Sequence, residues 1–224
     1  MKARDDTAFL WTLTPDELEA LTTLGRRQRY PKGAPMFVEG EQSDRVLAIL
    51  DGRVKVSLVT ADGKEVVLAV RGPGDLLGEL AFIDGEPRSA SATALDPVSS
   101  IVIPAEDFTR YLEKHPRIAL LLLRMVSRRL RDADRKRAEF AAFDTVGRVA
   151  SRLLELADRF GEPSGPDGIL ITLPLTQEEL AGWTGSSREA VSKALSTLRS
   201  LGFIETRRRA ITIRDANGLR KRAV

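Results

Sequence analysis

The sequence of 224 residues contains no cysteine and a single histidine, His115. The absence of cysteine excludes disulfides, thiolate metal sites and cysteine nucleophiles, and a single histidine argues against a multi-histidine metal site or a histidine-ligated haem. No run of 18 apolar residues occurs, and residues 1–4 are not followed by the apolar core of a signal peptide. We therefore expect a cytoplasmic protein with no bound metal and no membrane partner.

Negative charge is scarce in the second half of the chain. Residues 1–115 hold 14 basic and 19 acidic residues, a net charge of −5, whereas residues 116–224 hold 21 and 13, a net charge of +8. A basic C-terminal half is typical of proteins that bind a polyanion there, although a solvated helix surface has the same composition.

Short β-branched runs separated by turn residues fill residues 30–104. The runs are VLAIL, RVKVSLV, EVVLAV and VSSIVI, and the turns include Asp51-Gly52, Asp62-Gly63 and Asp84-Gly85. Turn signals about every 8–12 residues predict an all-β sandwich or barrel, with a hairpin tip at residues 61–64.

Helices are expected on both sides of these strands. Thr14 caps a helix over residues 14–24 through a capping box with Glu17, and Asp144 caps another over residues 144–160. Between them we expect helices over 105–115 and 116–143. Residues 161–168 are expected to form a loop, ILITLPL a short strand, and FIETRRRAITIRD a hairpin with a basic tip.

The helix over residues 116–143 has a heptad seam. Apolar residues recur at 3,4,3,4,3 spacing, interrupted by one arginine: Leu123, Val126, Leu130, Ala133, Arg137 and Phe140. Such a stripe is ordinary core when it packs against its own domain. A narrow seam on an otherwise highly charged helix favours a parallel helix pair between two subunits.

Two further helices are expected to meet in a tight turn at residues 183–186. The first opens with a capping box at Thr176, and the second begins at Ser187. Val191, Leu195 and Leu198 would face inward, and the outward side chains are those of Ser187, Arg188, Ser192 and Lys193. Because arginine, glutamate and lysine can read base edges, this helix–turn–helix followed by a basic hairpin predicts DNA binding, although paired helices are also common elsewhere.

The stretch GELAFIDGEPRSASATA, residues 78–94, holds an acid and a base among small residues. Arg88 can bind a phosphate through two parallel hydrogen bonds, and Glu79 can accept from a vicinal hydroxyl. Gly78 and Ala90 permit close approach of the backbone, and Ser89 adds a hydroxyl donor. The alternative is a surface ion pair between Glu79 and Arg88, which would contribute little.

In this order, the motifs resemble those of the cyclic-AMP receptor protein (CRP/FNR) family of bacterial transcription regulators, from about residue 10 to about residue 220. LTQEELAGWTGSSREAVSKAL is most similar to the actinobacterial branch. The resemblance implies an α+β fold with a cyclic-nucleotide-binding β-roll (jelly roll) in residues 1–115, a dimerisation helix in 116–143 and a winged helix–turn–helix in 144–224. It also implies an allosteric homodimer that is no enzyme, with double-stranded DNA and RNA polymerase as partners.

The resemblance assigns ligand contacts by position. Glu79, flanked by Gly78 and Leu80, would bind the ribose, and Arg88 with Ser89 and Ala90 would bind the cyclic phosphate. The apolar walls would be Val56 and Leu68.

On the DNA side the base readers would be Arg188, Glu189 and Lys193, where Lys193 stands at a position that many members fill with arginine. Thr176 would contact a phosphate, and Ser187 and Arg208 complete the set. The implied DNA site is a palindrome with half-sites like TGTGA.

The adenine side departs from the family pattern. Members that respond to cyclic AMP meet the adenine amino group with Thr-Ser, and the register places Ala133 and Asp134 there. Ala133 cannot bond adenine, and two Asp134 carboxylates near a dimer axis would repel unless arginines pair with them. Ala69 also stands where a serine is common. Cyclic AMP remains the expected ligand; the alternatives are another nucleotide, or a protein of this fold that is active without ligand.

Overall fold

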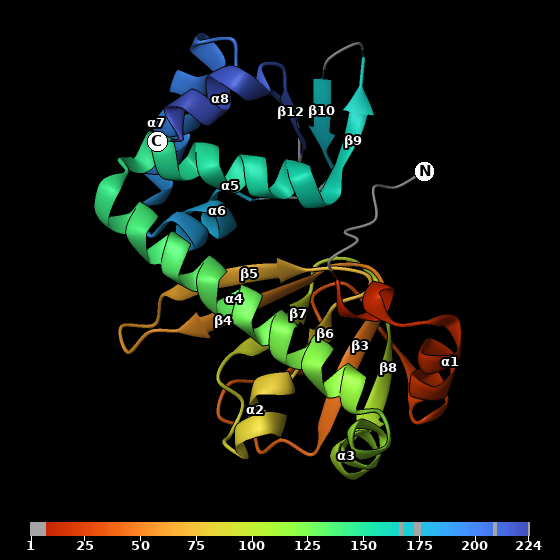
Figure 1. The fold of residues 1–224 in the computed structure, drawn as a ribbon. Helices are drawn as coiled ribbons and strands as arrows, with labels where there is room; N and C mark the ends of the chain where they lie inside the picture. Colours follow the sequence, from red (N-terminus) through yellow and green to blue (C-terminus); the bar gives the residue numbers. More distant parts are fainter. Residues whose placement is uncertain (1–7, 166–167, 173–175, 208–209, 224) are drawn as a thin grey trace. The chain divides into compact units, whose positions relative to one another are not determined.

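The computed structural model describes residues 8–165, 168–172, 176–207 and 210–223 (Figure 1). The chain divides into two compact units, one extending to Arg131 and the other starting at Asp132. This division falls inside the long helix α4 (Pro116–Ala142), so residues 132–142 of that helix belong to the second unit.

Two antiparallel four-stranded sheets form the first unit. In spatial order, one sheet contains β1 (Arg26–Tyr30), β8 (Val98–Pro104), β3 (Arg45–Asp51) and β6 (Leu76–Leu77). The other contains β2 (Pro35–Phe37), β7 (Ser91–Ala94), β4 (Val54–Val59) and β5 (Glu65–Arg71). The fold class predicted from the sequence is confirmed, and the four predicted apolar runs form β3, β4, β5 and β8, with the 61–64 hairpin between β4 and β5.

The alternation of side chains along β3 explains how the two layers are held. Leu47 and Ile49 enter a core shared with the second sheet. Val46 and Ala48, which point the other way, enter a core with the helices η1 (Phe9–Thr12), α1 (Pro15–Thr23), α3 (Ala105–Lys114) and α4. Because both faces of β3 are buried, its sequence VLAIL is continuously apolar rather than alternating.

Several elements of the structure differ from the sequence predictions. The six residues of α2 (Glu79–Asp84) form a helix that the sequence did not predict, bounded by Gly78 and Gly85 at positive φ. Residues 161–164 form an edge strand, β9 (Gly161–Ser164), and the predicted loop over 161–168 is wrong there. An edge strand tolerates Pro163, which is why its composition resembles a loop.

Helices on one sheet form the second unit. The sheet contains, in order, β11 (Ile204–Arg207), β12 (Ala210–Ile213), β10 (Gly168–Ile171) and β9. Helix α5 (Thr145–Phe160) packs against β10 and three helices: α6 (Gln177–Thr184), α7 (Arg188–Ser200) and α8 (Ala216–Arg222).

A buried cluster of charges attaches the last turns of α4 to α5. Arg152 is only 4% exposed and forms ion pairs with Glu139 of α4 and Glu155 of α5. Lys136 of α4 donates to Glu155 at 3.0 Å, and its ammonium lies 5.5 Å from the centre of the Trp183 ring. These contacts explain why residues 132–142 belong to the second unit.

The start of α5 is also fixed by α8. The Asp144 carboxylate accepts from the Gly147 backbone N–H at 2.8 Å and caps α5, as predicted. The same side chain forms an ion pair with Arg222 in the last turn of α8. Arg222 and the Gly147 N–H lower the pKa of Asp144.

Candidate functional sites

Arg88 is a buried cation, and one of its three side-chain nitrogens has no hydrogen-bond partner among the described residues. Its side chain donates from Nη1 to the Gly78 carbonyl at 3.1 Å and from Nη2 to the Arg45 carbonyl at 2.7 Å. The guanidinium lies 4.4 Å above the Phe37 ring, and Arg88 is 3% exposed. None of the residues that the structure describes accepts a hydrogen bond from its Nε. Burial and the neighbouring Arg45 lower the pKa of Arg88, but arginine remains charged in proteins.

Gly78 makes room for this guanidinium. Its φ of 77° is in the left-handed region, and a Cβ placed on it would lie 2.0 Å from Nη1 of Arg88. Glycine is therefore required here both by the backbone conformation and by the approach of Arg88.

Glu79, the first residue of α2, is 4% exposed and forms an ion pair with Arg129 of α4. The alternative of a surface pair between Glu79 and Arg88 is therefore wrong. Arg129 also donates to the Leu76 carbonyl at 2.8 Å, and its Nη2 lies 3.7 Å from Oδ1 of Asp75. The structure thus links the candidate hydroxyl-binding carboxylate directly to the long helix.

Sequence reasoning missed Arg129. The available signal was its spacing from Leu122 and Met125, which are buried on the inner face of α4. Arg129 lies seven positions after Leu122 and four positions after Met125, and residues at these spacings lie on the same face of a helix.

The other predicted ligand residues of the first unit differ in exposure. Ala90 is buried and Ser89 is exposed. Leu80 and Leu68 are 42% and 39% exposed, and Val56 packs against the core between the sheets.

The structure brings Gly78, Glu79 and Arg88 together within the first unit. Ala133 and Asp134 are exposed and belong to the second unit. Among the described residues no group of three or more histidine or acidic side chains could hold a metal ion.

Part of the predicted apolar seam of α4 is exposed. Leu123 and Leu130 are 60% and 63% exposed, whereas Val126 packs against the core of the first unit, in which Ile118, Leu122 and Met125 are buried. Leu123 and Leu130 are therefore additional to the face that α4 needs for its own domain.

The predicted helix–turn–helix consists of α6 and α7. Thr176 and Glu179 form the capping box of α6, and Ser187 caps α7 by accepting from the Ala190 N–H at 3.2 Å. Gly185 ends α6 at φ 56°, and a Cβ there would lie 2.5 Å from the Phe140 ring. The turn therefore needs glycine, as its place in the sequence indicated.

Helix α7 has the two faces that the sequence predicts. Val191, Leu195 and Leu198 are buried, and the exposed side chains include Ser187, Arg188, Glu189, Ser192 and Lys193. Hydrogen bonds from its own backbone N–H and from Ser187 lower the pKa of Glu189. Arg208 lies outside the described residues. None of the helices that the structure describes is long and apolar enough to cross a bilayer.

Comparison with known proteins agrees with this arrangement. Residues 27–115 match a cyclic nucleotide-binding domain, and residues 147–222 match a Crp-like helix–turn–helix domain. The chain is 37% identical, over 93% of each chain, to a CRP-like cAMP-activated global transcriptional regulator of Mycobacterium tuberculosis. It is 30% identical, over 91% of each, to a cyclic AMP receptor protein of Thermus thermophilus.

A solved structure of similar fold is the c-di-GMP responsive global regulator CLP of Xanthomonas campestris. It is 25% identical, with a TM-score of 0.77, and the match covers 89% of this chain and 99% of that one.

Proposed function

The chain belongs to the cyclic-AMP receptor protein family of DNA-binding transcription regulators, which are not enzymes, and we propose that it is a homodimer whose DNA binding is controlled by a cyclic nucleotide, with cyclic AMP as the first candidate. Residues 1–115 bind the nucleotide, residues 116–143 pair with a second copy, and residues 144–224 bind DNA. RNA polymerase is the further partner.

The observation that carries the ligand proposal is the unused Nε of Arg88 beside Glu79. A buried guanidinium with a free donor suits a cyclic phosphate, because charge-assisted bonds from arginine to phosphate are among the strongest in proteins. Glu79 is positioned to accept from a ribose hydroxyl while Arg129 neutralises it. A ligand at Glu79 therefore acts on α4 through one ion pair.

The exposed seam of α4 supports the homodimer. Two leucines at 60% and 63% exposure, seven residues apart, are suited to the matching leucines of a second parallel copy. Pairing of the long helices would set the spacing of the two copies of α7, which must be about one DNA turn apart to enter successive major grooves. A ligand switches this spacing if it binds one arrangement more tightly than the other.

The exposed side chains at the start of α7 support base reading. Arg188 suits guanine, Glu189 suits cytosine, and Lys193 suits guanine or a phosphate in half-sites like TGTGA. We expect Arg188→Ala to cost about 1–3 kcal/mol in DNA binding and to relax specificity at one guanine.

The second candidate is a regulator of the same fold that answers to a different nucleotide or needs none. Ala133 and Asp134 favour it, because the pair that meets adenine in cyclic-AMP-responsive members is Thr-Ser. The similar fold of a c-di-GMP responsive regulator supports this second candidate.

Calorimetric titration of nucleotide-stripped protein tests the proposal. Cyclic AMP, cyclic GMP and cyclic di-GMP are compared on the wild type, on Arg88→Ala, and on a control with the exposed arginine of α3 removed, Arg110→Ala. We expect micromolar binding of cyclic AMP that Arg88→Ala abolishes and Arg110→Ala preserves. Binding of a comparator alone supports the second candidate. If no nucleotide binds and the DNA affinity for a TGTGA palindrome is unchanged by all three, control by a cyclic nucleotide is refuted.

A further inference from the structure

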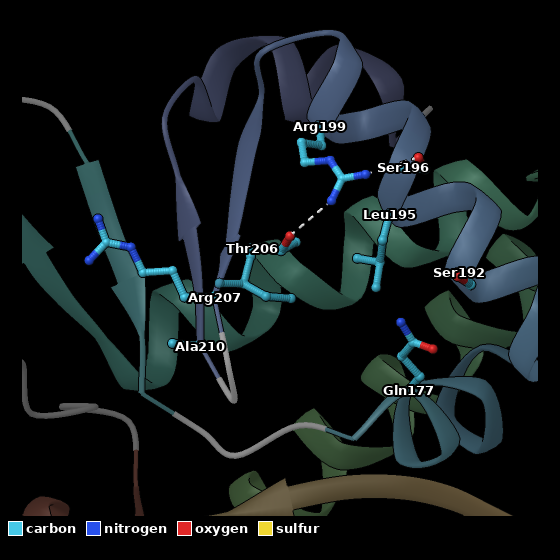
Figure 2. Close-up of a pocket in the computed structure, with 9 residues that line it drawn as sticks. Gln177, Ser192, Leu195, Ser196, Arg199, Thr206, Arg207 and Ala210 are labelled. Atoms are coloured by element: carbon cyan, nitrogen blue, oxygen red, sulfur yellow. Dashed lines mark hydrogen bonds between the residues drawn. The ribbon is translucent and has the colours of Figure 1, made fainter.

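A polar pocket of about 300 Å³ lies between α7 and the hairpin β11–β12 (Figure 2). Leu195 and Ile211 provide apolar lining. Hydroxyl and amide groups come from three separate elements: Gln177 of α6, Ser192 and Ser196 of α7, and Thr206 of β11. Four of the nine lining residues therefore carry neutral hydrogen-bonding groups that can donate.

Two arginines line this pocket, Arg199 and Arg207, and the side chain of Arg207 points away from that of Arg199 (Figure 2). Arg199 comes from the last turn of α7 and reaches toward β11, where Nη1 donates to the Thr206 hydroxyl at 3.4 Å, while Nη2 donates to the Ser196 hydroxyl at 3.2 Å (Figure 2). Within the part of the chain that the structure describes, no carboxylate forms an ion pair with it. Since guanidinium has five N–H donors, Arg199 retains both its charge and several donors for an anion.

Arg214, in the same unit, differs from Arg199 because it has a carboxylate partner. Its side chain spans the carboxylate of Glu205 with two bonds of 2.9 Å. Arg214 is thus neutralised within the fold, whereas the contacts of Arg199 with the described residues are to uncharged hydroxyls.

The position of Arg199 along α7 indicates which anion it meets. Eleven residues separate it from Arg188, and a rise of 1.5 Å per residue places the two about 16 Å apart along the helix. The major groove is about 12 Å wide, so a helix whose first turn reaches base edges brings its last turn to the wall of the groove. That wall is the sugar–phosphate backbone.

From these features, and on the basis of the proposed DNA binding, we propose that the pocket between α7 and the hairpin seats a backbone phosphate of DNA, with Arg199 as the direct contact. Gln177, Ser192 and Ser196 supply neutral donors around it. The net charge of +8 in residues 116–224 matches this partner. The contact positions the protein on the duplex and carries no base preference.

Salt dependence distinguishes a phosphate contact from a base contact. DNA binding of the full chain is measured on a TGTGA palindrome and on a scrambled duplex between about 50 and about 200 mM salt, with the ligand identified by calorimetry present if one is needed. For Arg199→Gln we expect the slope of log K against log salt to fall in magnitude by about 0.9, and the affinity at about 150 mM salt to fall on the order of fivefold on both duplexes. Arg199→Lys retains the charge and should retain the slope.

Arg214→Gln is the matched control, and we expect it to leave the slope unchanged. An unchanged slope in Arg199→Gln, or an affinity loss confined to the palindrome, overturns the phosphate seat. Thermal melting checks that Arg199→Gln folds. If it does not fold, Ser192→Asp replaces it, because this change places a negative charge in the pocket and should weaken DNA binding. An unchanged DNA affinity of Ser192→Asp then overturns the proposal. If the wild type itself does not prefer the palindrome, the proposed function fails instead.

Discussion

Replacing Arg129 with leucine should destabilise the first unit strongly, because the change leaves the Glu79 carboxylate buried without its cation. Glu79 is 4% exposed, and the Arg129 side chain is 18% exposed. Breaking a buried ion pair typically costs about 3–5 kcal/mol, whereas an exposed pair contributes about 0–1 kcal/mol. With a urea m value of about 2 kcal/mol/M, the unfolding midpoint should fall by about 1.5–2.5 M.

The assay needs a signal from the first unit. The chain has two tryptophans, and Trp183→Phe leaves Trp11 as the reporter for urea unfolding of that unit. Arg110→Leu is the matched control, because Arg110 pairs with Asp107 at 64% side-chain exposure in the same unit.

We expect Arg110→Leu to shift the midpoint by less than about 0.5 M. Glu79→Leu combined with Arg129→Leu should regain most of the loss, since no buried charge is then left alone. The reasoning is refuted if Arg129→Leu costs no more than the control, or if the double variant is no more stable than the single one.

Three further changes test other features of the structure. Gly78→Ala should abolish nucleotide binding in calorimetry, because the new Cβ would collide with Arg88. Gly63→Ala, at a solvent-exposed hairpin tip, is the control and should leave nucleotide binding intact. Leu130→Glu should convert the dimer to monomer in analytical ultracentrifugation, and an unchanged mass would argue against the seam as the interface. Burial would raise the pKa of Glu155, but Lys136 and Arg152 outweigh burial and lower this pKa below its ordinary value of 4.5. The ionised Glu155 carboxylate therefore stabilises the folded state above pH 4.5, and this stabilisation is lost as the pH falls through the lowered pKa. Glu155→Gln should therefore flatten the acid dependence of unfolding of the second unit, followed by Trp183 fluorescence.

Local signals predicted the helices well. Thr14, Asp144, Thr176 and Ser187 each cap a helix because a short polar side chain can satisfy a backbone N–H within three residues, a condition visible in the sequence. Helix α2 was missed because six residues between two glycines carry no repeating apolar pattern. Strand β1 was missed because its sequence, RRQRY, is polar and its place is at the edge of a sheet.

The candidate ligand site was predicted only in part. Residue chemistry singled out Glu79 and Arg88, but their partners depend on tertiary structure. Arg129 meets Glu79 from 50 residues further along the chain, and Arg88 is held by two backbone carbonyls, which have no sequence signature. Local reasoning therefore finds the charged groups of a site more readily than the contacts that hold them in place.

The clamp between α8 and α5 has a consequence for biosynthesis. Asp144 and Arg222 are 78 positions apart, and at about 5–20 residues per second a ribosome needs about 4–16 s to make the chain between them. The first unit is complete in sequence by Arg131 and can fold during that time. The nascent chain can therefore fold its β-roll well before α8 can dock against α5, so folding of the first unit does not wait for this clamp.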